Sequence, residues 1–192
     1  MTYLNIPTLV SSRLSLRPIN AKDVDAIFAI FSDSRVMRYW STPAHSSTAE
    51  AMLLIDKAQA GYQSEQMILF GIERHDTEQL IGTCTLHARN HVSRRGELGY
   101  ALGADHWGHG YMNEALERFL QFVFVELDLN RLEADIDPRN ESSARTLERL
   151  GFIREGYAKE RWIVSGELSD TAWYGLLARH WRERVSPLKA TL

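Results

Sequence analysis

Cysteine is almost absent from this chain, because Cys84 is the only one among 192 residues. One thiol forms no internal disulfide and cannot build a cysteine zinc cluster. Long apolar runs are also missing, and residues 1–7 lack the basic and apolar regions of a signal peptide. The formal net charge is −3 without a basic stripe, which disfavours a nucleic-acid-binding protein. We therefore expect a cytoplasmic protein that uses no metal and binds neither nucleic acid nor membrane.

Hydrophobic residues make up 44% and charged residues 24% of the chain, an ordinary balance for a folded protein. A length of 192 residues suits one medium-sized domain with a sizeable core. No internal repeat, linker or low-complexity segment divides the sequence. We expect a single domain over residues 1–192, with residues 186–192 as a flexible tail.

Hydrophobic periodicity in the first half of the chain predicts both strands and helices. Residues 12–17 alternate small or polar with apolar side chains, and Asn20 is a candidate N-cap for the helical spacing that follows. The predicted elements of this half are strands at 12–17, 67–73 and 80–88 and helices at 21–31 and 48–62.

The second half of the chain contains a predicted strand–helix–strand unit. Residues 96–103 are typical of a strand, residues 113–127 of a long apolar-rich helix, and residues 131–135 of the next strand. Because a helix joins the two strands, we expect them to lie parallel in one sheet. The remaining predictions are a helix at 140–150 and an antiparallel hairpin of 152–164 with 171–178. This alternation indicates an α/β protein.

The segment Trp107-Gly108-His109-Gly110-Tyr111 lies between the predicted strand at 96–103 and the helix at 113–127. A glycine-bearing turn there presents free backbone N–H groups at the positive end of a helix dipole, which can bind phosphate oxygens. The segment is no Walker loop, because no Gly-Lys-Ser/Thr follows, and it lacks the third glycine of a dinucleotide fingerprint. Taken alone, it is equally explained as a turn that needs glycine for its backbone conformation.

A second segment, Asn140-Glu141-Ser142-Ser143, is followed by Leu147-Glu148-Arg149-Leu150-Gly151-Phe152. Alone it indicates a helix with Asn140 as N-cap and Gly151 as C-cap. Together, the two segments are more specific. The turn, extended to Trp-Gly-x-Gly-Tyr-x-x-Glu-Ala, resembles motif A of the GNAT acetyltransferase superfamily, and the second segment resembles its motif B.

The resemblance extends over nearly the whole chain. The opening Arg13-Leu14-Ser15-Leu16-Arg17-Pro18 and the later Gly166-Glu167-x-x-Asp170 are most similar to the branch that contains the ribosomal-protein N-terminal acetyltransferases. The resemblance implies an α/β (α+β) GNAT fold, with a twisted mixed sheet of six or seven strands and helices on both faces. It also implies an acetyltransferase with acetyl-coenzyme A (acetyl-CoA) as its donor.

In this family the pyrophosphate of acetyl-CoA lies on the glycine turn, and the pantetheine arm pairs with the preceding strand like an added strand. Asn140 and Ser143 are implied to lie beside the thioester. One departure is Asp105, which stands where many members carry Gln or Arg. The cofactor-binding residues implied by the resemblance are Tyr100, Ala101, Leu102, Trp107, Gly108, His109, Gly110, Tyr111, Met112, Asn140 and Ser143.

Glu97 is the candidate base that removes a proton from the attacking amine. By strand alternation it shares a face with Gly99 and Ala101, whose small side chains leave space beside the carboxylate. The alternative is a strand-end carboxylate that lies in solvent or pairs with Arg94 or Arg95. Both interpretations fit the sequence.

Ser143 is the candidate acid, because the resembled branch is thought to use a serine here where other relatives use a tyrosine. Leu147 stands at the tyrosine position. The alternative is that Ser143 is only a residue of the first helical turn. Asn140 would position the pantetheine or the thioester, and Tyr157 is a reserve proton donor.

The acceptor is expected to be a primary amine, either on a small molecule or at a protein N-terminus. Trp40 and Trp162 are candidate walls of its groove, and each is equally explained as core. The protein is expected to be a monomer or a homodimer. Two rival functions remain open: a non-catalytic protein that binds or senses coenzyme A, and an unrelated phosphate-binding α/β protein.

Overall fold

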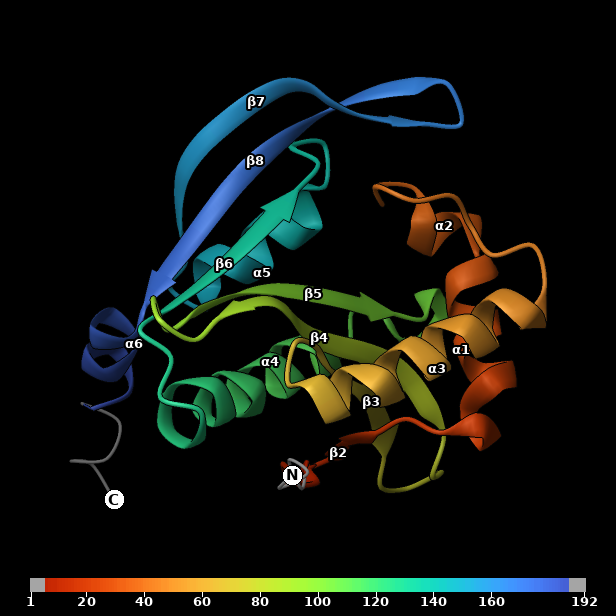
Figure 1. Ribbon diagram of the computed structural model, residues 1–192, viewed down its shortest axis with the longest axis horizontal. Coiled ribbons are helices and arrows are strands. Elements are labelled where there is room, and N and C mark those ends of the chain that lie inside the picture. Colours follow the sequence, from red (N-terminus) through yellow and green to blue (C-terminus); the bar gives the residue numbers. More distant parts are fainter. Residues whose placement is uncertain (1–5, 187–192) are drawn as a thin grey trace.

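The computed structural model describes residues 6–186, so residues 187–192 of the expected tail lie outside it. Within that range the strands form one mixed eight-stranded sheet in the order β1-β2-β3-β4-β5-β6-β8-β7 (Figure 1). The strands are β1 Leu9–Val10, β2 Leu14–Pro18, β3 Ile68–Arg74, β4 Leu80–Asn90, β5 Arg95–Leu102, β6 Arg131–Ile136, β7 Ile153–Val164 and β8 Glu167–Leu177. The expected six or seven strands are two or one fewer than the eight observed, and the strand that periodicity did not predict is β1, whose two residues are too few to show one.

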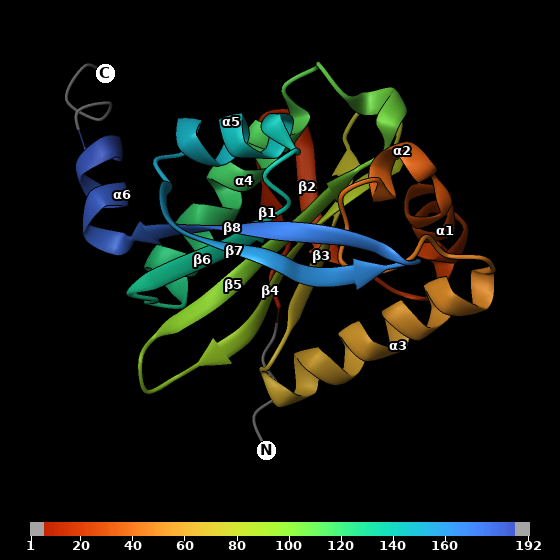
Figure 2. The ribbon, with the colours of Figure 1, turned by 90° about the horizontal axis from the view of Figure 1, so that it is seen from above.

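Helices cover both faces of the sheet, as expected (Figure 2). Two helices lacked a clear sequence signal: α2, which is only one turn long, and α6 at the end of the described chain. The helices are α1 Val24–Ser32, α2 Ser34–Met37, α3 Thr48–Ser64, α4 Tyr111–Gln121, α5 Glu141–Arg149 and α6 Ala178–Val185. A π-helical segment, Phe122–Glu126, continues α4, and a short 3₁₀ turn, Ala21–Asp23, precedes α1 and is capped by Asn20 as predicted.

The two faces of the sheet bury separate apolar clusters. One lies under α4 and α5 and contains the fully buried rings of Phe70, Phe119 and Phe124. The other lies under α1 and α3 and includes Ile55. Cys84 belongs to the first cluster, and burial raises the pKa of its thiol, so this residue packs the core.

β5 and β6 are parallel and joined through α4, as the sequence predicted. Their pairing covers only three residue pairs and ends where Glu97 lies opposite Glu133. Beyond this point the two strands diverge (Figure 1). The last five residues of β5 therefore have no neighbouring strand on the β6 side, and their backbone groups on that side face an opening in the sheet.

The β7–β8 hairpin arches over this opening (Figure 2). Register shifts between Arg154 and Gly156 and between Ala158 and Trp162 bend it away from the plane of the sheet. Its turn lies next to the segment after α2, where Arg38 Nη1 is 3.2 Å from Glu167 Oε1. Within residues 6–186 no helix is long and apolar enough to cross a membrane.

Candidate active site

Two cavities open along β5 from the point where β5 and β6 diverge. The turn cavity, of about 570 Å³, is lined by Trp107, Gly108, Gly110, Tyr111 and neighbouring residues. The hairpin cavity, of about 290 Å³, lies between β5, β6 and the β7–β8 hairpin and is lined by Glu97, Gly99, Asp135 and Trp162 among others. The residues that line both cavities are Tyr39, Trp40, Tyr100, Asn140 and Ser143.

The glycine turn has the backbone conformation that its sequence requires. Gly108 and Gly110 have φ of +79° and +78°, in the left-handed region that favours glycine. No side chain caps the start of α4, so its first N–H groups remain available. Arg13 holds the turn in place, since its Nη1 donates to the His109 carbonyl at 3.1 Å and its Nε to Glu114 at 2.6 Å.

Two arginines line the turn cavity. Arg35 is paired with Asp33 and Asp105, whereas Arg149 makes no ion pair with another residue in the range 6–186. His106 also lines it, but burial lowers the pKa of its imidazole, so the charge comes from the arginines. The carboxylate of Asp105 points into solvent and lies 3.3 Å from Arg35. Asp105 does not line the cavity, but it offsets part of the charge of Arg35, so Arg149, unpaired within residues 6–186, is the cation that the cavity offers an anion.

The unpaired stretch of β5 forms one wall of the turn cavity through Tyr100, Ala101 and Leu102. The indole N–H of Trp107 donates to the Leu102 carbonyl at 2.8 Å, so this one acceptor on the strand is already paired. Asn113 lines the same cavity with a buried side-chain oxygen that has no hydrogen-bond partner. The cavity thus offers both a strand edge and an unpaired polar atom to a ligand.

Asn140 and Ser143 lie at the junction of the two cavities. Asn140 caps α5, because its side-chain oxygen accepts from the Ser143 N–H at 3.1 Å. The cap places the Ser143 hydroxyl beside β5, where its Oγ lies 2.6 Å from the Tyr100 hydroxyl. Tyr100 was expected to act through its backbone, so this side-chain contact was not foreseen.

Glu97 lines the hairpin cavity, and the alternative in which it pairs with a neighbouring arginine is wrong. Arg94 pairs with Asp128 at 2.5 Å and Arg95 with Glu133 at 2.9 Å. Glu97 itself makes no ion pair among residues 6–186. Gly99 lines the same cavity as Glu97, and a side chain added there would meet His87 and Thr85 at ordinary contact distances of 3.8 and 4.0 Å, whereas Ala101 is buried and lines the turn cavity.

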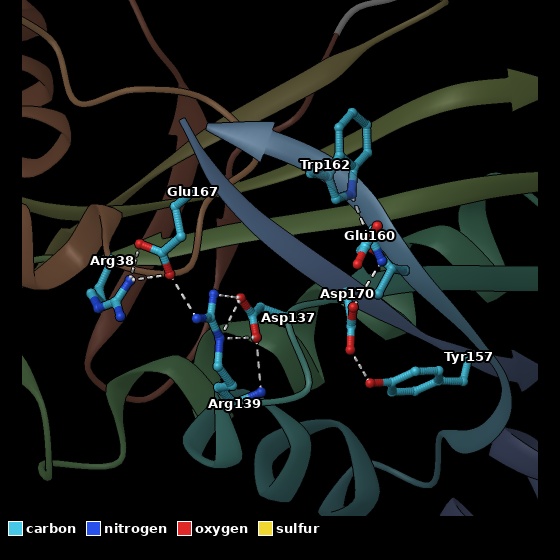
Figure 3. Close-up of polar contacts among 9 residues, drawn as sticks. Arg38, Asp137, Arg139, Tyr157, Glu160, Trp162, Glu167 and Asp170 are labelled. Carbon is cyan, nitrogen blue, oxygen red and sulfur yellow. Dashed lines mark hydrogen bonds and ion pairs between the residues drawn. The ribbon is translucent and has the colours of Figure 1, made fainter. Parts of the chain in front are cut away.

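The outer wall of the hairpin cavity comes from the β7–β8 hairpin and the segment after α2. Trp162 lines it and donates its indole N–H to Thr171 Oγ1 at 3.0 Å, while Trp40 packs edge-to-face on Phe31 with ring centroids 5.3 Å apart. Tyr157 does not line either cavity. Its hydroxyl donates to Asp170, which raises the pKa of Tyr157 and lowers that of Asp170 (Figure 3).

A chain of ion pairs fastens the hairpin turn to the rest of the wall (Figure 3). Arg139 Nη1 lies 2.6 Å from Glu167 Oε1, and its Nη2 lies 2.6 Å from Asp137. Arg38 contacts Glu167 from the other side. We call Arg38, Asp137, Arg139 and Glu167 the clasp. Its residues come from the α2–α3 segment, from the segment after β6 and from β8, which are distant in sequence.

The structure brings the predicted site residues to these two cavities with two exceptions, the reserve donor Tyr157 and His109. The His109 side chain is exposed and stacks on Tyr111 with ring centroids 5.7 Å apart. Sequence reasoning assigned no role to Arg13, Arg35, Asn113, Arg149 and Asp135. Arg13, Asn113 and Arg149 stand within the quoted segments, but only the fold places Arg13 against the turn and the other four in the cavity linings.

The family model described as "Acetyltransferase (GNAT) domain" matches residues 13–153. The chain belongs to the GNAT acetyltransferase family. The "Uncharacterized N-acetyltransferase YoaA" of Bacillus subtilis is 37% identical over 171 residues, which cover 89% of this chain and 97% of that protein. The "Putative ribosomal N-acetyltransferase YdaF" of the same species is 28% identical over 90% of this chain and 95% of its own length. A solved GCN5-related N-acetyltransferase from Brucella melitensis shares 25% identity with a TM-score of 0.82, over 96% of this chain and 84% of that one.

This GNAT protein is therefore an acetyltransferase enzyme, and its donor is acetyl-CoA. The residues of the turn cavity fit that donor. Gly108 has no atom within 4 Å of where a side chain would begin, which leaves room for a group against the turn. Free N–H groups of α4 and two arginines suit phosphates, and the open edge of β5 with the unpaired Asn113 oxygen suits an amide-bearing arm.

Proposed function

We propose that this enzyme transfers the acetyl group from acetyl-CoA in the turn cavity directly to a primary amine in the hairpin cavity. The observation that carries this proposal is the junction: Tyr39, Trp40, Tyr100, Asn140 and Ser143 line both cavities, so ligands in the two can meet there. Cys84 is buried away from both cavities, so no cysteine intermediate is required.

Bound acetyl-CoA supplies an acetyl thioester at the junction. Glu97 accepts the proton that the amine must lose, because it is a carboxylate without an ion pair in the cavity that would hold the amine. As the carbon–nitrogen bond forms, the carbon–sulfur bond breaks and its electron pair goes to sulfur. Ser143 stabilises the developing thiolate through its hydroxyl, and Asn140 positions the group by fixing the start of α5.

A protein N-terminal amino group is the favoured acceptor. Its ordinary pKa of about 7.7–8 lies well below that of an alkyl amine, so a carboxylate base removes its proton at smaller cost. The name of YdaF, a putative ribosomal N-acetyltransferase, is in line with this choice. A small-molecule amine is the second candidate, because the spermidine N(1)-acetyltransferase of Vibrio cholerae is 23% identical over 84% of this chain.

An acceptor panel tests the proposal. Thiol release from acetyl-CoA is measured with N-terminal peptides and with small amines, including spermidine, and we expect release that depends on peptide concentration. Release with small amines alone would replace the favoured acceptor by the second candidate. Tight binding of coenzyme A without acceptor-dependent release would instead support the non-catalytic alternative. A single domain over residues 1–192, a cytoplasmic location, and a monomer or homodimer remain predictions.

A further inference from the structure

We propose that Tyr100 is a positioning residue, which holds the Ser143 hydroxyl so that its hydrogen points at the sulfur of the departing thiolate. This inference deepens the proposed function and rests on it for the role of Ser143. The contact that suggests it is the 2.6 Å separation of Tyr100 Oη and Ser143 Oγ at the junction of the two cavities.

Either hydroxyl can donate in the 2.6 Å contact between Tyr100 Oη and Ser143 Oγ, and Tyr100 Oη also has the Ser143 carbonyl in range at 3.4 Å. We assign Tyr100 as the donor to Ser143 Oγ, because this contact is the shorter of its two. In that arrangement the hydrogen of Ser143 points elsewhere.

The Ser143 hydroxyl has few hydrogen-bond partners. Ser143 is only 8% exposed, and within residues 6–186 its Oγ is bonded to Tyr100 alone. Without Tyr100, a serine in a helix can rotate and donate to a backbone carbonyl one turn earlier. The tyrosine thus excludes rotamers in which Ser143 would be unavailable to a ligand in the cavities.

Tyr100 orients this hydrogen bond and does not supply a proton. Burial raises the pKa of its phenol far above neutrality, so the group stays protonated and remains a donor throughout the working pH range. The amine proton goes to Glu97, and the electron pair of the broken carbon–sulfur bond stays on sulfur. The thiolate is stabilised by the Ser143 hydrogen bond and takes its proton from solvent after release.

The test compares the Tyr100→Phe, Ser143→Ala and double variants. The first readout needs no acceptor: the thiol of bound coenzyme A is titrated through the ultraviolet absorbance of its thiolate. We expect the thiol pKa to be lowest in the unaltered enzyme. Each single variant should raise it by the same amount, and the double variant should raise it no further, because both residues act through one hydrogen bond.

The second readout is steady-state kinetics on the active acceptor. Each single variant should lower kcat by about 10- to 100-fold, the range for a hydrogen bond to a charged group, with the KM for acetyl-CoA within about twofold. The matched control is Tyr62→Phe, which removes another buried tyrosine hydroxyl, one bonded to the Leu69 carbonyl on the far face of the sheet. Tyr62→Phe should change neither the pKa of the bound coenzyme A thiol nor kcat.

An unchanged thiol pKa in Tyr100→Phe, or additive losses in the double variant, would overturn the inference. If Tyr100→Phe fails to fold, 3-fluorotyrosine at position 100 replaces it. This stronger donor keeps the hydroxyl and should lower the bound thiol pKa, and no change would again reject the idea. A protein that shows the thiol shifts but acetylates no amine would refute the proposed function, while the hydrogen bond by which Tyr100 orients Ser143 toward the bound sulfur would stand.

Discussion

The turn cavity and the hairpin cavity are built in different ways. The turn cavity is formed mainly by β5, α4 and α5, whose inner faces belong to the larger apolar cluster, and Arg35, Val36, Tyr39 and Trp40 close one side of it. The hairpin cavity is closed by the exposed β7–β8 hairpin and by the segment after α2. The donor half of the site is thus fixed by the core, while the acceptor half can vary without disturbing it.

The clasp illustrates this difference. Arg38, Arg139 and Glu167 have side chains that are 51%, 44% and 48% exposed. Exposed ion pairs contribute little to stability because water screens them. The hairpin turn is therefore held by contacts that can change at small cost to the fold. Four substitutions, in order of decreasing effect, test this contrast.

Gly110→Glu should have the largest effect. It places a negative charge and a side chain where the donor phosphates would bind, and we expect the affinity for acetyl-CoA to fall by about 100-fold or more. Isothermal titration measures this. Gly166→Glu is the matched control, because Gly166 has a similar φ of +85° and open space around it but lies in the hairpin turn. The same loss in the control would mean that backbone strain is the cause.

Glu97→Gln should lower turnover by roughly 100-fold at low pH, where the acceptor amine is protonated and a base is needed most. The difference from the unaltered enzyme should shrink as the pH rises and free amine accumulates. The dependence of kcat/KM on pH measures both the loss at low pH and its decrease at higher pH. Asp135→Asn removes a second carboxylate from the same cavity and should leave the shape of the profile unchanged. Parallel profiles for Glu97→Gln and the unaltered enzyme would remove Glu97 from the mechanism.

Gly99→Val should raise the KM for the acceptor by about tenfold, the scale at which added methyl groups in a pocket act. Its Cβ would meet His87 and Thr85 at 3.8 and 4.0 Å, which are ordinary contacts, so the strand should tolerate it. The affinity for acetyl-CoA should not change. Gly99→Ala should have a smaller effect in the same direction, and an unchanged acceptor KM in both variants would place the acceptor elsewhere.

Glu167→Gln should have the smallest effect, a rise of about two- to fivefold in the acceptor KM, because it weakens two exposed ion pairs of the clasp. Hydrogen bonds from Arg139 and Arg38 lower the pKa of Glu167 below that of an ordinary glutamate. The contribution of the clasp to stability should therefore be fully present at a pH above the ordinary glutamate pKa, and it should be lost as the pH falls through the lowered pKa. Glu160→Gln neutralises another exposed carboxylate of the hairpin and should not alter KM. If Glu167→Gln and Glu160→Gln raised the acceptor KM equally, the cause would be the overall charge of the hairpin and not the clasp.

The same contrast decides what could be predicted from the sequence. Gly108, Gly110 and Asn140 were identified because a turn and a cap impose local rules on residue type, and these rules are visible without a fold. Asp135 and Arg149 were missed because tertiary folding alone brings them to the cavities. For Glu97, the arginines that compete for it had to be located before its pairing with them could be rejected.

The early end of the β5–β6 pairing has a consequence for association between molecules. An unpaired strand edge is a template on which another chain can pair and start aggregation. Here that edge belongs to a strand in the middle of the sheet and opens into a cavity walled by α5 and the segment after α2. Because the edge lies inside the sheet and under α5, it is removed from the outer edges at β1 and β7, where another chain would most readily pair.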